Sequence, residues 1–142
     1  MSTISPSLKF VMNLSRLQAA LSRRFNRLSI HGISLTDFMI LSLLDQAAGR
    51  KLRRIDLAES VGLTASGITR MLLPLEKIGL VEREASERDA RVSYVVLTAA
   101  GKDLYEHAKD TANAIAKETV PPDVAKSLSL VELYRQLGIT LI

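Results

Sequence analysis

The stretch from Ile55 to Thr98 limits the fold of this chain more narrowly than any other part of its 142 residues. It begins with IDLAESVG, which is long enough for two helical turns and ends in a glycine suited to close a helix. Thr64 is a good N-cap for the following run, TASGITRMLLPLEKIGL, and Gly79 is a good C-cap for it. The runs LVEREA and VSYVVLT then have the composition of strands, and the polar segment SERDAR joins them. The order helix, turn, helix and β-hairpin is that of a winged helix-turn-helix.

Two helices are predicted before this stretch. Ser5 is a good N-cap and Pro6 suits the first helical position, so the first helix begins there and extends to about Leu28. Its apolar residues recur every three or four positions and form one stripe, made of Leu8, Val11, Leu14, Leu17, Leu21, Phe25 and Leu28. Thr36 is the expected N-cap of the second helix, and Gly49 is expected to end it.

The carboxyl-terminal third is predicted to be helical as well. Thr98 can cap a long helix that runs to about Thr119, and Pro121 and Pro122 break it. A last helix is expected from about Asp123, with an apolar stripe made of Val124, Leu128, Val131, Tyr134, Leu137 and Leu141. Both ends of the chain therefore carry amphipathic helices with more apolar surface than a small central domain can cover, which favours a partner.

The composition argues against an enzyme. The chain has no cysteine, which excludes disulfides, thiolate metal sites and thiol redox sensing. His31 and His107 are its only histidines, and neither has a neighbouring histidine or carboxylate pair that would make a metal site or a general base. No glycine-rich phosphate loop or nucleophile elbow is found. We therefore expect no catalytic residue, no metal and no cofactor.

Charge and hydropathy point to a nucleic-acid partner in the cytoplasm. The net charge is +4 and the isoelectric point is near 9.6, a modest basic excess that fits a polyanion. Residues 1–30 hold Lys9, Arg16, Arg23, Arg24 and Arg27 and no acidic residue. The apolar runs are far shorter than the ~20 residues that cross a bilayer, and the amino end does not resemble a secretion signal. We expect a cytoplasmic protein without a membrane partner.

The helix that begins at Thr64 has the surface that a DNA-reading helix needs. Near its start, Ser66 and Thr69 offer hydroxyl groups, and Arg70 can bind guanine or phosphate. We expect these three residues and Thr64 to face the major groove. The alternative is an ordinary surface helix with polar residues. Pro74 lies within the same helix, where it removes one backbone hydrogen bond and is expected to cause a kink.

The hairpin tip holds a second candidate site. Arg88, Asp89 and Arg91 lie in SERDAR, and a carboxylate two residues from an arginine can hold that side chain outwards. An arginine presented in this way suits a narrow minor groove, whose potential is strongly negative. The alternative is a solvated loop without function. In the basic run before the first helix of the motif, Arg53 and Arg54 are candidate phosphate contacts, or residues of a solvated connector.

In these residues the chain resembles the MarR family of bacterial transcriptional regulators, with a match from Asp56 to Gly101. The family's wing pattern is met by Asp89, Arg91, Val95, Leu97, Thr98 and Gly101, and Arg83 stands at the expected place on the first wing strand. The pattern of the two helices is met by Leu57, Ala58, Gly62, Leu63, Ser66, Thr69 and Arg70. Each of these short motifs is common in proteins, but their occurrence together in this order is specific to the family.

The resemblance implies a homodimer that binds double-stranded DNA at a pseudo-palindromic operator, as a repressor or an activator. Of the two we expect a repressor, released by a small aromatic or phenolic effector. The resemblance also implies that Arg91 enters the minor groove and that Asp89 orients it. The expected fold is mainly α with a small β-hairpin wing, divided into dimerisation helices (residues 1–33 and 101–142) and a winged helix-turn-helix (residues 34–100). Two alternatives remain: a winged-helix module that binds a protein, and an architectural DNA binder with little sequence choice.

Overall fold

The computed structural model describes residues 3–142 and is mainly helical, with one small sheet. Its elements are α1 (Pro6–Arg24), the 3₁₀ helix η1 (Phe25–His31), α2 (Leu35–Gln46), the 3₁₀ turn η2 (Ala48–Arg50), β1 (Lys51–Arg53), α3 (Arg54–Val61), α4 (Ala65–Lys77), β2 (Val81–Ala85), β3 (Ser93–Leu97), α5 (Ala99–Thr119), α6 (Pro122–Ser127) and α7 (Val131–Leu137). The three strands form one antiparallel sheet in the order β1-β3-β2. The predicted fold class is confirmed.

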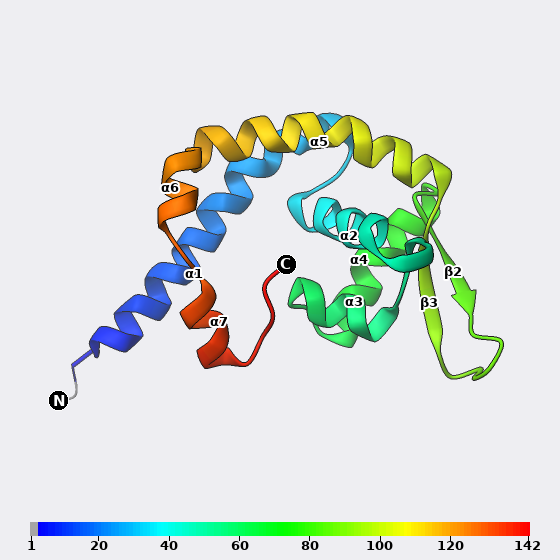
Figure 1. Cartoon of the computed structure of the whole chain (residues 1–142), viewed down its shortest axis with the longest axis horizontal. Coiled ribbons are helices and arrows are strands. Elements are labelled where there is room, and N and C mark those ends of the chain that lie inside the picture. Colours follow the sequence, from blue (N-terminus) through cyan, green and yellow to red (C-terminus); the bar gives the residue numbers. More distant parts are fainter. Residues whose placement is uncertain (1–2) are drawn as a thin grey trace.

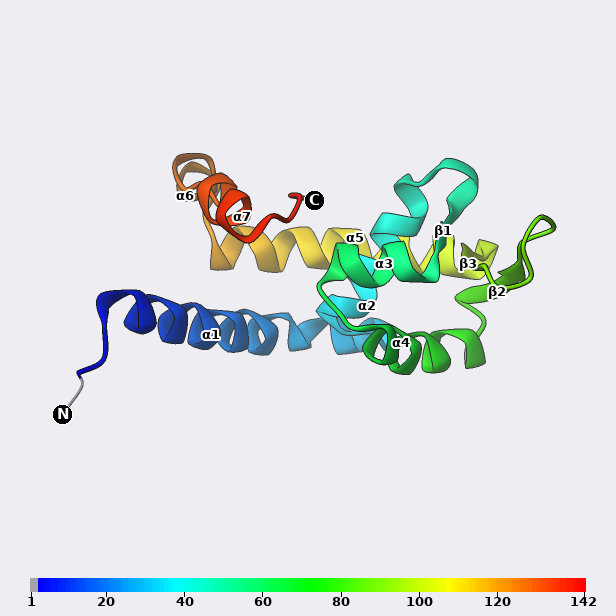
Figure 2. The same ribbon diagram turned by 90° about the horizontal axis from the view of Figure 1, so that it is seen from below.

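The chain forms a lobe and an arm that share helix α5 (Figure 1). The lobe contains α2, α3, α4 and the sheet, and the hairpin of β2 and β3 projects from its far end. The arm contains α1, the end of α5, α6 and α7. Figure 2 shows α1 on one side of α5 and the short carboxyl-terminal helices on the other. Helix α1 extends away from the lobe, whereas the segment that follows α7 returns to lie beside α2 and α3.

The core lies in the lobe and under α5. Leu41 and Leu44 of α2, Leu57 of α3 and Ile68 of α4 are fully buried together. Helix α5 contributes its own buried stripe, made of Tyr105, Ala108, Ala112 and Ile115. By contrast, no residue of α1, α6 or α7 is buried. The hydrophobic effect of this single chain thus stabilises the lobe and α5, and it leaves many apolar side chains of α1, α6 and α7 exposed.

Several helix ends follow the predicted chemistry. Ser5, Thr64 and Thr98 each cap a helix, because each side-chain oxygen accepts a hydrogen bond from the backbone N–H three residues later. Gly62 closes α3 with φ +75°, a left-handed conformation that glycine adopts without strain. Helix α4 runs through Pro74 and ends at Lys77, so the lost hydrogen bond falls near its carboxyl end.

The ends of the first two helices differ from the prediction. The α-helix α1 ends at Arg24, four residues before Leu28, and the chain continues as a 3₁₀ helix. Ser34, and not Thr36, caps α2: Ser34 Oγ accepts from the Asp37 N–H, and the Asp37 carboxylate accepts from the Ser34 N–H. This reciprocal pair satisfies two backbone donors, whereas a single threonine cap satisfies one. Helix α2 ends at Gln46, before the predicted stop at glycine 49.

Two further elements were predicted wrongly. Lys51–Arg53, for which no strand was predicted, is a strand because Leu52 and its neighbours pair with Val95 and the adjacent residues of β3. The single last helix expected from about Asp123 is two short helices, separated at Leu128–Leu130. A three-residue strand exists only through its partner, and a short helix is marginal without packing, so neither outcome can be read from local composition.

No single helix in residues 3–142 is long and apolar enough to cross a membrane, although the bent pair Pro6–His31 and Leu35–Gln46 passes on combined length and composition.

Candidate nucleic-acid interface

Helix α4 presents the predicted polar residues on the side opposite its core contacts. Ile68, Leu72 and Leu75 are buried, which fixes the rotation of the helix about its axis. Ser66 and Arg70 are exposed as a consequence. An exposed serine and arginine one turn apart can hydrogen-bond base edges or phosphates in a major groove.

Thr64 has a structural role at the start of this helix. Its hydroxyl oxygen accepts from the Gly67 N–H at 3.0 Å and lies 3.3 Å from the hydroxyl of Ser66. The cap uses one of its two lone pairs. Thr64 is exposed, so a contact with DNA remains a prediction for it, but its hydroxyl is already committed to holding the helix end.

Thr69 is half-buried and is held by two other groups. Its hydroxyl donates to the carbonyl of Ala65 at 3.0 Å, and the guanidinium of Arg54 donates to the same hydroxyl oxygen. Arg54 is the first residue of α3 and was predicted only as a phosphate contact. The neighbouring Arg53 is exposed at the end of β1.

The wing brings Asp89 and Arg91 together. Asp89 Oδ1 accepts from the Arg91 backbone N–H at 3.0 Å and from its Nε at 3.3 Å. The Arg91 side chain is nevertheless 91% exposed. The turn is closed by Ser86, whose side chain accepts from the Arg88 N–H at 3.2 Å and from the Asp89 N–H at 3.4 Å. The side chain of Arg88 forms no ion pair among residues 3–142.

Ion pairs that the sequence analysis missed connect the wing to the rest of the lobe. Arg83 of β2 pairs with Glu76 of α4 at 3.4 Å. Lys51 of β1 pairs with Glu84 of β2 at 2.9 Å, and its amine lies 5.0 Å from the centre of the Tyr94 ring. The hydrogen bond to Glu84 raises the pKa of Lys51 above its usual value, and partial burial opposes this shift. No sequence signal marks these pairs, because they join residues seven and 33 positions apart.

The two histidines have structural contacts on α5. His31 Nε2 lies 2.8 Å from the hydroxyl of Thr111, and His107 Nδ1 lies 2.7 Å from the carbonyl of Asp103. Within the described residues no group of three or more metal-ligating side chains is close enough to hold an ion.

The comparisons with known proteins agree with this geometry. The MarR family profile matches residues 33–93. The chain is 31% identical over 99 residues to the HTH-type transcriptional regulator MhqR of Bacillus subtilis (strain 168). The aligned residues cover 69% of this chain and 67% of that protein. Further curated relatives align over about half of their own length.

Two solved structures share the fold. Sco3205, a MarR family transcriptional regulator from Streptomyces coelicolor solved in complex with DNA, is 24% identical with a TM-score of 0.72, over 97% of this chain and 89% of that one. The organohalide-sensing regulator RdhR-CbdbA1625, solved with 2,4-dichlorophenol bound, is 18% identical with a TM-score of 0.79, over 94% and 82%.

Proposed function

The chain belongs to the MarR family of transcriptional regulators, and from that membership we propose that it represses transcription by binding a pseudo-palindromic operator as a homodimer. The observation that carries the proposal is the pairing of two DNA-reading parts on one lobe: the exposed polar face of α4 and the braced Arg91 of the wing. Two-fold symmetry of the protein implies half-sites about one helical turn apart, ~10 base pairs. Transcriptional regulators are not enzymes, and DNA as the partner favours the cytoplasm.

The individual contacts follow from the exposed groups and from the half-buried Thr69. Ser66, Thr69 and Arg70 face the major groove, and Thr64 caps the helix at the same groove edge. Arg91 enters the minor groove. Arg53 and Arg54, at the join of β1 and α3, contact phosphates. Arg88, which forms no ion pair within the described residues, contacts a phosphate from the wing tip.

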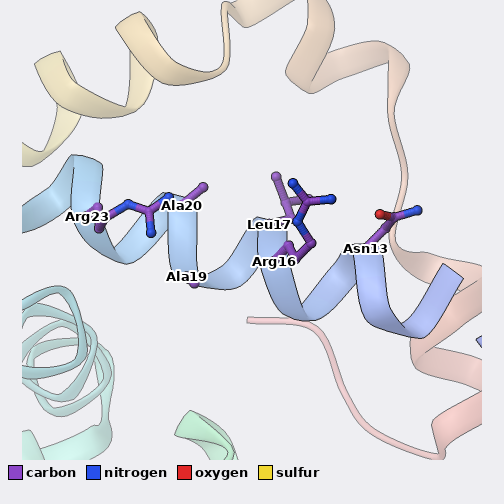
Figure 3. Close-up of a pocket in the computed structure, with 6 residues that line it drawn as sticks. All are labelled: Asn13, Arg16, Leu17, Ala19, Ala20 and Arg23. Carbon is purple, nitrogen blue, oxygen red and sulfur yellow. The ribbon is translucent and has the colours of Figure 1, made fainter. Parts of the chain in front are cut away.

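The dimer is formed by residues 1–33 and 101–142, and residues 34–100 bind DNA. The support is the unburied apolar surface of the arm, whose exposed large side chains include Leu8, Phe10, Val11, Met12, Leu17, Val124, Leu128, Leu130, Val131 and Leu137. A pocket along α1 is lined by six residues that all come from that helix, among them Arg16, Leu17 and Arg23 (Figure 3). A pocket with only one wall in the single chain suits a second copy as its cover.

A small phenolic effector has a suitable pocket between lobe and arm. It has a volume of about 510 Å³ and lies between α2, α3 and the segment that follows α7. Met39, Leu43 and Tyr134 give it apolar and aromatic walls, while the carboxylates of Asp56 and Glu59 disfavour an anion. We therefore propose that a neutral phenol binds here and favours one spacing of the two lobes. Added phenol should release the protein from its operator, and benzoate should not.

The test is fluorescence anisotropy with DNA from upstream of the chain's own gene, against random duplex, between about 50 and 200 mM salt. A specific regulator should prefer its operator by at least about 10³ and lose affinity steeply as salt rises. Footprinting should show a bounded symmetric region, whereas an architectural binder would protect no bounded site. Absence of binding at physiological salt would favour the protein-interaction module instead and would end the proposal.

A further inference from the structure

The contact between Arg54 and Thr69 joins the start of α3 to the reading face of α4. The Arg54 Nη1 donates to Thr69 Oγ1, and the Thr69 hydroxyl donates in turn to the carbonyl of Ala65. Thr69 lies one residue before Arg70, so this chain of hydrogen bonds ends within the proposed reading surface. Nothing in the family pattern or in the spacing of the sequence pairs these two residues, which are 15 positions apart.

The placement of Arg54 is unfavourable for a residue that only stabilises its own helix. As the first residue of α3 it puts a cation at the positive end of the helix dipole, where an acidic residue such as Asp56 is preferred. Arg54 forms no ion pair among residues 3–142, and its described side-chain partner is a neutral hydroxyl. A guanidinium has five N–H donors, so the bond to Thr69 leaves others free for a phosphate.

The two hydrogen bonds of the Thr69 hydroxyl, with Arg54 and with the Ala65 carbonyl, decide which hydrogen bonds Thr69 can make to a base. A hydroxyl has one hydrogen and two lone pairs. The hydrogen is directed at the Ala65 carbonyl and one lone pair is taken by Arg54, so one lone pair remains. Thr69 can then accept from the amino group of adenine or cytosine and can place its methyl group against thymine, but it cannot donate to guanine.

We propose that Arg54 is a positioning residue that holds Thr69 as an acceptor on the recognition helix and at the same time binds a backbone phosphate. Binding of the DNA phosphate backbone is thereby coupled to recognition of one base pair in each half-site. This inference rests on the proposed function, because it requires an operator that the protein distinguishes from other DNA.

The test is a double-mutant cycle with Arg54→Met, Thr69→Val and both changes together. Valine keeps the shape of threonine without its hydroxyl, and methionine keeps most of the length of arginine without its charge. Affinity is measured for the operator and for variants changed at one base pair at a time. Arg54→Met should weaken operator binding roughly 5- to 150-fold, the range of one specific contact, and should flatten the preference at one base pair per half-site. In the Thr69→Val background it should no longer affect that preference.

Two control variants separate positioning from charge. Arg53→Met removes a neighbouring exposed arginine and should weaken all sequences equally, with a salt slope lower by about one. Arg54→Lys keeps the charge and should restore the salt slope without restoring the base preference, because an ammonium is not the planar fork that reaches two partners. Thermal midpoints within error of the wild type identify variants that remain folded.

Two other outcomes distinguish a failure of this inference from a failure of the proposed function. A uniform loss in Arg54→Met, independent of Thr69→Val, would mean that Arg54 only binds phosphate and would overturn this inference alone. A wild-type protein that did not distinguish its operator from random duplex would overturn the proposed function and this inference with it.

Discussion

At the wing tip, Asp89 restrains Arg91 and does little for stability. Both the backbone N–H and the Nε of Arg91 bond to the same carboxylate oxygen, yet the arginine side chain remains 91% exposed. An ion pair in water contributes between about 0 and 1 kcal/mol. The pair with Asp89 has its larger effect on DNA binding, because immobilising a free arginine side chain at an interface costs about 0.5–1.5 kcal/mol of conformational entropy. A side chain already held outwards has less of that entropy to lose.

Replacing Arg91 should therefore weaken DNA binding without changing the stability of the fold. We expect Arg91→Ala to weaken operator binding by ~1–3 kcal/mol, measured by anisotropy. Its thermal midpoint should hardly change, because the lost pair is exposed. Arg88→Ala, at the same tip but without the brace, is the matched control and should cost less. Equal affinity of Arg91→Ala and wild type would rule out the minor-groove role.

Arg70 should behave differently from Arg91, because it lies on α4, the helix that we propose enters the major groove. Arg70→Ala should lower affinity and also relax the sequence preference at one position in each half-site, by ~1–3 kcal/mol of discrimination. Binding to a set of single-base-pair operator variants measures both effects. If all sequences lost affinity to the same extent, Arg70 would be a phosphate contact.

At the scale of elements, the wing and α5 are closely packed where they meet at Thr98 and Gly101. The Thr98 hydroxyl donates to the carbonyl of Gly79 at 2.6 Å and accepts from the N–H of Gly101. The Thr98 N–H donates to the carbonyl of Leu80. A Cβ at Gly101 would lie 2.1 Å from that carbonyl oxygen and 2.7 Å from a methyl group of Leu97. Helix α5 can therefore start against the sheet only if residue 101 has no side chain.

Gly101→Ala should destabilise the whole lobe. The clash is with a backbone oxygen, which cannot rotate away, so we expect a loss of about 1–3 kcal/mol or more in the free energy of unfolding, measured by chemical denaturation. Gly67→Ala is a matched control, because Gly67 occupies the same third position of a threonine-capped helix. Its nearest neighbour would be the Thr64 hydroxyl at 3.1 Å, and alanine adds up to ~1 kcal/mol of helix propensity. An equal cost for both variants would show that crowding at the junction is not the cause.

The elements also show what the sequence alone can predict. Thr64 and Thr98 were predicted as helix caps, and the hairpin strands were predicted within two residues of their observed ends, because caps and β-branched runs act over a few positions. β1 was missed because its strand character comes from β3, more than 40 positions away. The contact of Arg54 with Thr69 was missed for the same reason. Tertiary pairing decides such features, and no local pattern encodes it.

At the scale of the whole molecule, the arm is the part whose apolar surface a single chain does not bury. Helix α5 is buried along one side from Tyr105 to Ile115, while α1 beside it has no buried residue. The Arg27–Glu118 pair at 2.6 Å joins η1 to the end of α5, but both groups are exposed and contribute little. Apolar surface of this extent on two sides of α5 is stabilised when another copy covers it.

Breaking this surface should separate the two reading lobes. We expect Leu17→Lys, in which a leucine 55% exposed in the single chain is replaced by a cation, to shift the mass measured by light scattering from dimer towards monomer. Ile78→Lys is the matched control, because Ile78 is 60% exposed but belongs to the lobe, and it should leave the dimer intact. The monomer would engage one half-site at a time, so its operator affinity should fall by about 10²–10⁴ as the advantage of linked sites is lost. A monomeric wild type would contradict the homodimer itself. A dimer that tolerates Leu17→Lys and is disrupted by Ile78→Lys would place the interface on the lobe and contradict the assignment of the arm.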